Sequence, residues 1–315
     1  MFDLIIGIPT FRRPEMLEKL LLSISECNRN KHLIKSVNIV VVDNDSQRTA
    51  ENTVRKFNEK GIEGLKASYH CFPEKGLANV RNEMLRQSLK IKSDFIVFVD
   101  DDEFVTSHWL DGHLKTILQY NADAVRGPVL AVLNSGVKKE IVQLFKREKY
   151  PEGTRLYRWT TGNLMLRTST LLKNKIWFDP RFNETGSEDY YFGVQMQKYG
   201  ASLYWAADAV TYENIPDLRA TIKWVIKRRF RMPFMYSRVQ VIEGNYFKVF
   251  KKMVVSFTNI LMGLAASVLL IFPGKFRYWG LLKIVEGTGG IMGIFKKSFK
   301  EYKSGHHHSL ILHES

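Results

Sequence analysis

The feature that most constrains the fold is a regular alternation of short apolar runs and helical patterns in the first hundred residues. Short apolar runs rich in β-branched residues predict strands, and apolar residues at helical spacing between them predict helices. The expected strands are residues 3–8, 37–42, 66–71 and 95–99, and the expected helices are residues 14–27, 48–60 and 77–90. Because alternating strands and helices form right-handed crossovers, the sequence predicts an α/β protein with a mostly parallel, doubly wound sheet.

Polar clusters follow three of the expected strands, at residues 10–13, 43–46 and 100–103. In open α/β sheets, ligands bind in the crevice beyond the carboxyl ends of the strands. The clusters therefore indicate a binding site at this edge. Neither a Gly-x-Gly-x-x-Gly fingerprint nor a Gly-Lys-Ser/Thr phosphate loop is present, so phosphate affinity needs another source.

Four consecutive carboxylates, Asp100 to Glu103, directly follow the expected strand 95–99. Like charges this close repel and raise one another's pKa. A solvated acidic loop is one interpretation, and a helix N-cap with Asp102 and Glu103 favouring the helix dipole is another. Because the run lies at the ligand-binding edge, we interpret it as a site for Mg²⁺ or Mn²⁺, which prefer oxygen ligands. Such an ion would act as a Lewis acid for a departing diphosphate.

The net charge of +15 is concentrated in the last third of the chain. Residues 219–252 contain 10 Lys/Arg against 1 Asp/Glu, and residues 275–303 contain 7 against 2. The segment between them, 253–274, is uncharged. Nucleic-acid binding would require basic residues on an element that reads a groove, so no nucleic-acid partner is expected. Basic flanks around an apolar stretch favour an anionic membrane surface instead.

The apolar segment Met253–Phe272 has about the minimum length of a membrane span. A single span would place the basic residues of 275–303 outside the cell, against the excess of Lys/Arg on cytoplasmic loops. We expect a shallow or re-entrant hairpin with both ends in the cytoplasm, with a single span and a buried core helix as alternatives. The N-terminus lacks a basic leader, and the two cysteines fit a reducing compartment, so a cytoplasmic domain is expected.

Six motifs resemble, in order, those of family-2 glycosyltransferases, which have the glycosyltransferase-A fold. They are residues 7–14, 41–46, 76–82, 99–103, 161–163 and 186–189. Residues 203–231 further resemble bacterial enzymes that build succinoglycan-type exopolysaccharide. The resemblance implies a catalytic domain over 1–218, a basic helical membrane-associating module over 219–303 and a flexible tail over 304–315, in which His306 to His308 carry no expected role.

The resemblance also implies a donor site for a nucleotide sugar. Asp43 would accept a hydrogen bond from the N3–H of the base, a donor that uracil and thymine have and cytosine lacks. Arg81 would face the diphosphate, because a guanidinium pairs with phosphate in a fork geometry. Asp100 would contact the ribose or sugar and, with Asp102, the metal. The remaining implied donor residues are Pro9, Thr10, Arg12, Asn44, Gly76, Asn82 and Asp101.

Two of these residues have simpler interpretations. Asp43 could cap the helix that follows it, and Arg81 could pair with Glu83 or with another surface acid. Each alternative is reasonable for the residue in isolation. The ordered set of motifs favours the donor-binding roles.

The acceptor side is implied by the same resemblance. Transfer with inversion needs a general base that takes the proton of the acceptor hydroxyl as it attacks the anomeric carbon. Asp189 is expected to be that base, with Glu188 as its support, although carboxylates at a helix start are often only dipole partners. The implied acceptor-binding residues are Trp109, Gly162 and Asn163.

Together these expectations describe an inverting, metal-dependent transferase that moves a sugar from a UDP-sugar to a lipid-linked oligosaccharide at the cytoplasmic face of the membrane. The Gln-x-x-Arg-Trp motif of processive relatives is absent, so synthesis of a long homopolymer is not expected. The alternatives are a nucleotidyltransferase on a similar sheet and a membrane scaffold with a decayed site. The first would need a glycine-rich phosphate loop near the first strand, and the joint presence of Asp43, Asp100, Asp102 and Asp189 weighs against the second.

Overall fold

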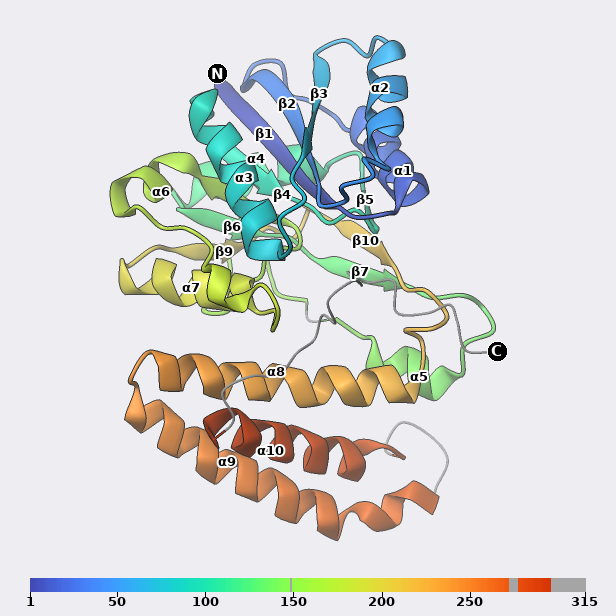
Figure 1. The fold of residues 1–315 in the computed structure, drawn as a ribbon, viewed down its shortest axis with the longest axis vertical. Helices are drawn as coiled ribbons and strands as arrows, with labels where there is room; N and C mark the ends of the chain where they lie inside the picture. The colour runs from blue at the N-terminus through green and yellow to red at the C-terminus, as the bar shows by residue number, and fades with distance from the viewer. Residues whose placement is uncertain (148, 272–276, 296–315) are drawn as a thin grey trace. The chain divides into compact units, whose positions relative to one another are not determined.

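The computed structural model describes residues 1–147, 149–271 and 277–295. The described chain divides into two compact units (Figure 1). The first contains Met1–Leu130 and Arg147–Asn214, and the second contains Ala131–Lys146 and the described residues from Ile215 onward. The expected C-terminal helical module is present, but a segment from the middle of the chain joins it. The expected tail with His306 to His308 lies outside the described residues.

The first unit is built on a seven-stranded sheet with the strand order β3-β2-β1-β4-β8-β6-β9. Strands β3, β2, β1 and β4 are parallel, β8 runs antiparallel to both of its neighbours, and β6 is parallel to β9. The mostly parallel sheet predicted from the sequence is therefore confirmed. The strands are β1 (Phe2–Thr10), β2 (Ile34–Asp43), β3 (Leu65–Cys71), β4 (Phe95–Phe98), β6 (Ala124–Arg126), β8 (Leu164–Arg167) and β9 (Leu203–Trp205).

The first three helices of the first unit fall where the apolar periodicity predicts them. The three expected helices and four expected strands agree with the structure to within three residues at every end. Proline at the first position of α1 suits a helix start, since its missing N–H would have no intrahelical partner there. The helices are α1 (Pro14–Ser25), α2 (Glu51–Glu59), α3 (Leu77–Lys90), α4 (Trp109–Gln119), α6 (Thr168–Asn174) and α7 (Glu188–Lys198), with a short 3₁₀ turn η1 (Pro180–Phe182).

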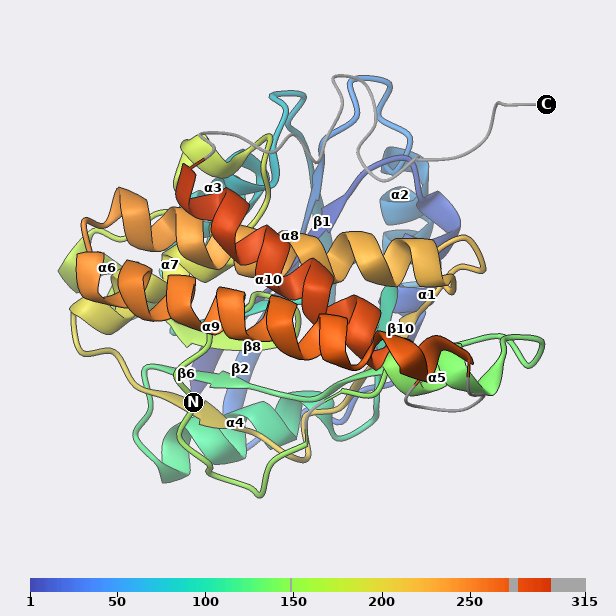
Figure 2. The same cartoon turned by 90° about the horizontal axis from the view of Figure 1, so that it is seen from below.

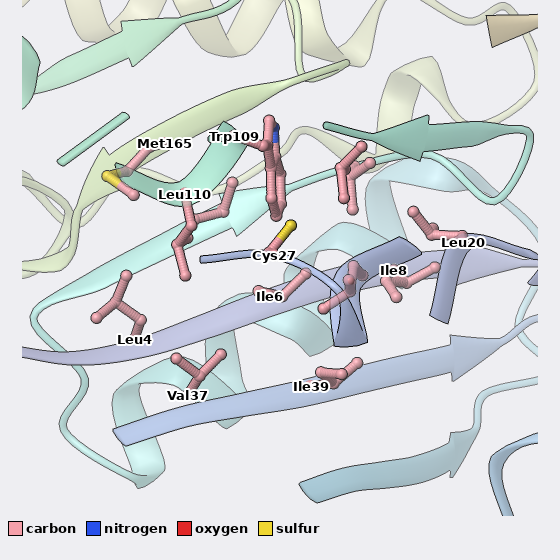
Figure 3. Close-up of a cluster of buried hydrophobic side chains, with 14 of the residues drawn as sticks. Leu4, Ile6, Ile8, Leu20, Cys27, Val37, Ile39, Trp109, Leu110 and Met165 are labelled. Carbon is pink, nitrogen blue, oxygen red and sulfur yellow. The ribbon is translucent and has the colours of Figure 1, made fainter. Parts of the chain in front are cut away.

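The helices cover both faces of the sheet, which explains why its central strands are apolar throughout. Alternate residues of β1 point to opposite faces: Leu4, Ile6 and Ile8 join one buried cluster with α1, α2 and α4, whereas Ile5 joins another with α3, α6 and α7. Figure 3 shows part of the first cluster. These two apolar layers fix the sheet register and hold the carboxyl ends of β1, β2 and β4 side by side.

A second, smaller sheet has the order β5-β10-β7 and consists of β5 (Glu103–Val105), β10 (Thr211–Asn214) and β7 (Val129–Val132). Strands β5 and β10 are antiparallel and pair Glu103 with Glu213. The short strand β5 therefore ties the end of the acidic run to a distant part of the chain.

The second unit is helical (Figures 1 and 2). Helix α10 packs against α8 and α9 through its glycines: a Cβ on Gly287 would lie 2.4 Å from the Ser256 carbonyl oxygen, and one on Gly293 would lie 2.1 Å from that of Phe234. The elements are α5 (Lys139–Leu144), α8 (Ile222–Ile242), α9 (Tyr246–Ala265), the 3₁₀ helix η2 (Ser267–Ile271) and α10 (Trp279–Phe295).

The expected membrane segment Met253–Phe272 is not a separate element. It is divided between α9 and η2, and α9 begins seven residues earlier and includes three lysines, while Phe272 lies outside the described residues. Among the described helices, none is both long and apolar enough to span a bilayer.

Candidate active site

A pocket lies at the carboxyl ends of β1, β2 and β4, where the polar clusters of the sequence converge. The sheet brings together segments that are 30 to 90 residues apart, because the parallel register aligns Thr10 with Asp43. Seven of the expected donor and metal residues line this pocket: Pro9, Thr10, Asn44, Arg81, Asp100, Asp101 and Asp102.

Of the two adjacent arginines after β1, Arg13 lines the pocket and the expected Arg12 does not. Arg13 pairs with Asp101 at 3.1 Å and with Asp102 at 3.2 Å through the same Nη1. Arg12 has a left-handed φ of 53° and pairs with Asp45, and its side chain is 45% exposed. Which of two adjacent side chains in a loop faces a pocket depends on the backbone turn. The sequence alone does not reveal that turn, so sequence reasoning missed Arg13.

The acidic run is held by neighbouring polar groups. Asp101 is buried and accepts hydrogen bonds from the Thr10 hydroxyl and from Arg13. The side chain of Asp100 is 39% exposed and lies 3.5 Å from Arg81. Burial, followed by repulsion from neighbouring carboxylates, raises the pKa of Asp100 to about 6, against the opposing effect of Arg81. Burial likewise raises the pKa of Asp101 to about 7, although Arg13 opposes the shift.

Glu103 was part of the acidic run but received no role from the sequence. It is buried, burial and Asp100 raise its pKa well above the usual range, and its Oε2 has no hydrogen-bond partner among the described residues. Carboxyl groups are thus crowded at the end of β4, and the neighbouring arginines offset the rise of their pKa values only in part.

This charge distribution fits a divalent cation held by Asp100 and Asp102. Both carboxylates line the pocket, and the charge of Asp102 raises the pKa of Asp100, so a cation beside them would stabilise the ionised pair. Two protein carboxylates leave other coordination positions to phosphate oxygens and water. The described residues contain no group of three or more potential metal ligands.

Asp43 has a different position from the expected one. It is fully buried, and its carboxylate accepts hydrogen bonds from the amides of Asp45 and Ala50 and from the Tyr69 hydroxyl. This geometry argues against a contact with a nucleotide base and corresponds to the alternative, in which Asp43 caps the start of α2. Burial raises its pKa in spite of these three donors.

The neighbouring Asn44 lines the pocket instead. Its Nδ2 donates to the carbonyls of Phe72 and Glu74 at 2.6 and 2.7 Å, which fixes the orientation of the amide. Its Oδ1 has no hydrogen-bond partner among the residues that the structure describes. An unpaired buried acceptor is costly unless a ligand supplies a donor, so Asn44 is a candidate for base recognition.

Arg81 connects the pocket to α7. Its guanidinium is buried, forms an ion pair with Glu188 at the start of α7 and lies 3.5 Å from Asp100 at the end of β4. Arg81 lines the pocket, as a contact with a diphosphate requires. The contact itself stays a prediction. The alternative pairing of Arg81 with Glu83 is not found, because Glu83 pairs with Arg86 and the Arg81 guanidinium contacts Glu188.

The rest of the glycine–arginine–asparagine segment has a structural role that the sequence did not show. Asn82 exchanges hydrogen bonds of 2.8 Å with both backbone groups of Phe178. Asn183 Oδ1 accepts a hydrogen bond from the amide of Ala78 at the start of α3. The same side chain lies so close to Gly76 that a Cβ on Gly76 would be 2.0 Å from Asn183 Cγ. These contacts engage the Asn82 amide with the backbone and leave no room for a side chain at residue 76, and the donor-binding roles of Gly76 and Asn82 stay predictions.

The two adjacent acids of α7 are therefore not equivalent. Glu188 is buried and paired with Arg81, whereas Asp189 is only partly buried. Asp189 is close enough to the pocket for its charge to raise the pKa of Asp100. Of the two, Asp189 is the one that an acceptor hydroxyl could approach.

Two expected acceptor residues lie inside the protein instead of at the pocket. Trp109 and Asn163 are fully buried, and the indole donates to Asn163 Oδ1 at 2.7 Å. Asn163 also contacts His113 and donates to the carbonyls of Pro128 and Ala209. Because their polar groups are already paired, Trp109 and Asn163 cannot contact an acceptor directly.

Gly162 retains a position consistent with its expected role. It is partly exposed, and a Cβ there would lie 3.8 Å from an Asp100 carboxylate oxygen and 3.2 Å from one of Glu103. The buried contacts of the next residue therefore position Gly162 beside the acidic run.

The fold and the pocket define an α/β protein of the glycosyltransferase-A type, with clustered carboxylates at the carboxyl ends of its parallel strands. The family profile described as Glycosyl transferase family 2 matches residues 5–174. Because this match covers more than half of the sequence, the chain belongs to glycosyl transferase family 2.

A curated relative from Rhizobium meliloti (strain 1021), the succinoglycan biosynthesis protein ExoM, is 29% identical over 249 residues, which are 74% of each chain. Among solved structures, S. aureus TarS 1–349 in complex with UDP-GlcNAc matches 92% of this chain and 91% of that one, with a TM-score of 0.54 and 17% identity. The mannosyltransferase PcManGT from Pyrobaculum calidifontis, in complex with GDP-Man and Mn²⁺, has a TM-score of 0.62 at 14% identity. The match covers 94% of this chain and 88% of that one. These two likenesses show the fold.

The chain spans about half, 55%, of the longer TarS chain. The matched part therefore leaves a large region of that protein without a counterpart here.

Proposed function

We propose that the protein is an inverting, metal-dependent glycosyltransferase that moves a sugar from a nucleoside-diphosphate donor to a lipid-linked oligosaccharide. The observation that supports the proposal is the chain of contacts from Asp100 in the pocket through Arg81 to Glu188, the residue before the partly exposed Asp189. The family match weighs against the nucleotidyltransferase and scaffold alternatives.

In the proposed reaction, Asp189 accepts the proton of the acceptor hydroxyl while the oxygen bonds to the anomeric carbon. The bond between that carbon and the diphosphate oxygen breaks, and the nucleoside diphosphate leaves with the electron pair. Arg13 and Arg81 supply positive charge at the pocket wall. A Mg²⁺ or Mn²⁺ ion held by Asp100 and Asp102 would stabilise the charge of the leaving diphosphate.

A UDP-sugar is the proposed donor. The fixed amide of Asn44 leaves only an acceptor oxygen for the base, and the N3–H of uracil is a donor whereas N3 of cytosine is an acceptor. The S. aureus TarS structures with UDP and UDP-GlcNAc support a nucleotide-sugar donor of this kind.

The proposed setting is bacterial surface polysaccharide biosynthesis at the cytoplasmic face of the plasma membrane. Its support is the likeness to a succinoglycan biosynthesis protein and the basic character of the second unit, which suits a lipid-linked, pyrophosphate-bearing acceptor at an anionic surface.

The proposal is tested with purified protein in detergent, a panel of nucleotide sugars, Mn²⁺ and an extract of lipid-linked oligosaccharides. We expect release of UDP and a mass gain of one sugar on the acceptor, and neither with Asp189→Asn. Release of pyrophosphate in place of UDP would favour the nucleotidyltransferase, and the absence of sugar transfer from every donor would contradict the proposal.

A further inference from the structure

An apolar stripe runs along one side of α9 in the second unit. Its residues follow one another at spacings of three and four, so they share one face of the helix, and every one of them is exposed. Phe247 is 78% exposed and Leu261 is 67% exposed. The α9 stripe consists of Phe247, Phe250, Val254, Phe257, Leu261 and Leu264, and Val268 in η2 extends it.

The packing of the second unit does not use this stripe. The buried residues of α9 are Ser256 and Gly263, on another side of the helix. A Cβ on Gly287 would lie 2.4 Å from the Ser256 carbonyl oxygen, and one on Gly263 would lie 2.6 Å from that of Gly280, so α9 meets α10 through its small residues. A contiguous exposed apolar surface of this length marks an interaction site.

The charges on α9 are all positive. Residues 246–271 contain Lys248, Lys251 and Lys252 and no acidic residue. Lys248 and Lys251 are exposed, whereas Lys252 is half-buried with its ammonium 5.7 Å from the Tyr236 ring. A second copy of α9 would offer these lysines no carboxylate, whereas anionic headgroups would neutralise them.

We propose that the α9 stripe is the surface through which the protein lies on an anionic lipid bilayer. The helix would rest in the plane of the headgroups with its aromatic and aliphatic side chains inserted and Lys248 and Lys251 at the phosphates. This arrangement replaces the hairpin expected from the sequence, since the insertion is lateral and begins at Phe247. It rests on the proposed membrane setting and deepens it by assigning the surface of the protein that contacts the lipid, and it does not depend on the identity of the acceptor.

The test measures co-flotation of the full-length protein with vesicles of phosphatidylcholine, with and without one third phosphatidylglycerol. We expect Phe257→Ser/Leu261→Ser to lower binding to the anionic vesicles by at least about tenfold, because two inserted apolar side chains are lost. Lys248→Ala/Lys251→Ala should lower binding to anionic vesicles by on the order of tenfold and leave binding to neutral vesicles unchanged.

The matched control is Leu172→Ser/Tyr199→Ser, which removes two apolar side chains that are 61% and 60% exposed in the first unit. It should bind vesicles like the wild type. Wild-type vesicle binding that the stripe substitution leaves unchanged, or no vesicle binding at all, would overturn the proposal. A wild-type dimer that the stripe substitution converts to monomer, with vesicle binding intact, would identify a second copy as the occupant.

UDP binding in solution, measured on the same variants, separates this proposal from the proposed function. The stripe variants should bind UDP like the wild type, because the pocket lies wholly in the first unit. Loss of vesicle binding with UDP binding retained is the expected result. A wild-type protein that binds vesicles but no nucleotide would refute the proposed donor and leave the docking surface standing.

Discussion

Arg81 and Glu188 form a buried ion pair across 107 residues of sequence. The pair joins helix α3 to the first turn of α7, and the same guanidinium lies 3.5 Å from Asp100. Glu188 is buried in this pair, whereas Asp189, its neighbour, is only partly buried. The fork of one arginine thus couples the donor side of the site to the candidate base.

Replacing Arg81 by Lys should lower kcat by at least about tenfold, because an ammonium cannot bond Glu188 and Asp100 as a fork. Removing the charge with Arg81→Ala should cost about 3–5 kcal/mol of stability, because the buried Glu188 would lose the arginine charge that balances it. Arg86→Lys, an exposed change on the same helix, is the matched control. Turnover and chemical denaturation report the two effects, and an Arg81→Lys enzyme with wild-type kcat would contradict the coupling.

Asp189→Asn should lower kcat by roughly 10²–10⁴ while donor binding stays nearly intact, because the amide keeps the shape but cannot take a proton. Glu188→Gln should instead reduce stability, since it removes the charge that balances Arg81. Single-turnover transfer and thermal unfolding distinguish the two variants. A folded Glu188→Gln enzyme that is far less active than Asp189→Asn would assign the base to Glu188.

Asp102→Ala should abolish transfer and weaken Mn²⁺-dependent binding of UDP, since the cation would lose a carboxylate while the diphosphate charge remains. Titration calorimetry with UDP, with and without Mn²⁺, gives the measurement. The wild type should lose activity in excess chelator and recover it on addition of Mn²⁺. Activity that persists in chelator would rule out the metal role.

Asn44→Ala should remove the preference for UDP over CDP, because it removes the unpaired acceptor oxygen that we propose for the N3–H of uracil. The wild type should bind UDP on the order of tenfold more tightly than CDP, because one hydrogen bond to the base contributes about that much. Asp43→Asn is the comparison, since Asp43 is buried beneath α2 and should affect stability instead. Retention of the preference in Asn44→Ala would exclude Asn44 from base recognition.

His113 should make the protein less stable in mild acid. Burial lowers the pKa of His113 to about 4, whereas the unfolded value is about 6.5. Between these values the unfolded chain binds the extra proton, so the contribution of His113 to stability falls as the pH drops below about 6.5. The raised pKa values of Asp100, Asp101 and Glu103 change stability in the opposite direction, so the effect of His113 is measured against a variant that lacks it. The loss at pH 5 should be on the order of 2 kcal/mol. Urea unfolding at pH 7 and pH 5 should show that the wild type loses stability relative to His113→Phe, and the same change in both proteins would contradict the neutral, buried state.

The sequence predicted most of the first unit because its signals are local. The β-branched runs and the helical periodicity between them depend on neighbouring residues, and the order of elements dictates a parallel sheet. The convergence of Thr10, Asn44 and Asp100 follows from that sheet, since the carboxyl ends of parallel strands share one edge. The antiparallel strand β8 and the mid-chain segment of the second unit carry no comparable local signal.

The sequence by itself determined the fold class, the edge that holds the site and the residue types available there. Only the tertiary structure decided that Arg13 lines the pocket instead of Arg12, that Asn44 lines it instead of Asp43, and that Glu188 pairs with Arg81. Adjacent residues share the same local pattern, and their exposure depends on backbone turns and on partners far away in the chain. Asn82 and Asn163 belong to motifs that the sequence reveals, but the sequence does not reveal their partners. The amide of Asn82 pairs with the backbone of Phe178, and that of Asn163 pairs with the carbonyls of Pro128 and Ala209, contacts that exist only after the chain has folded.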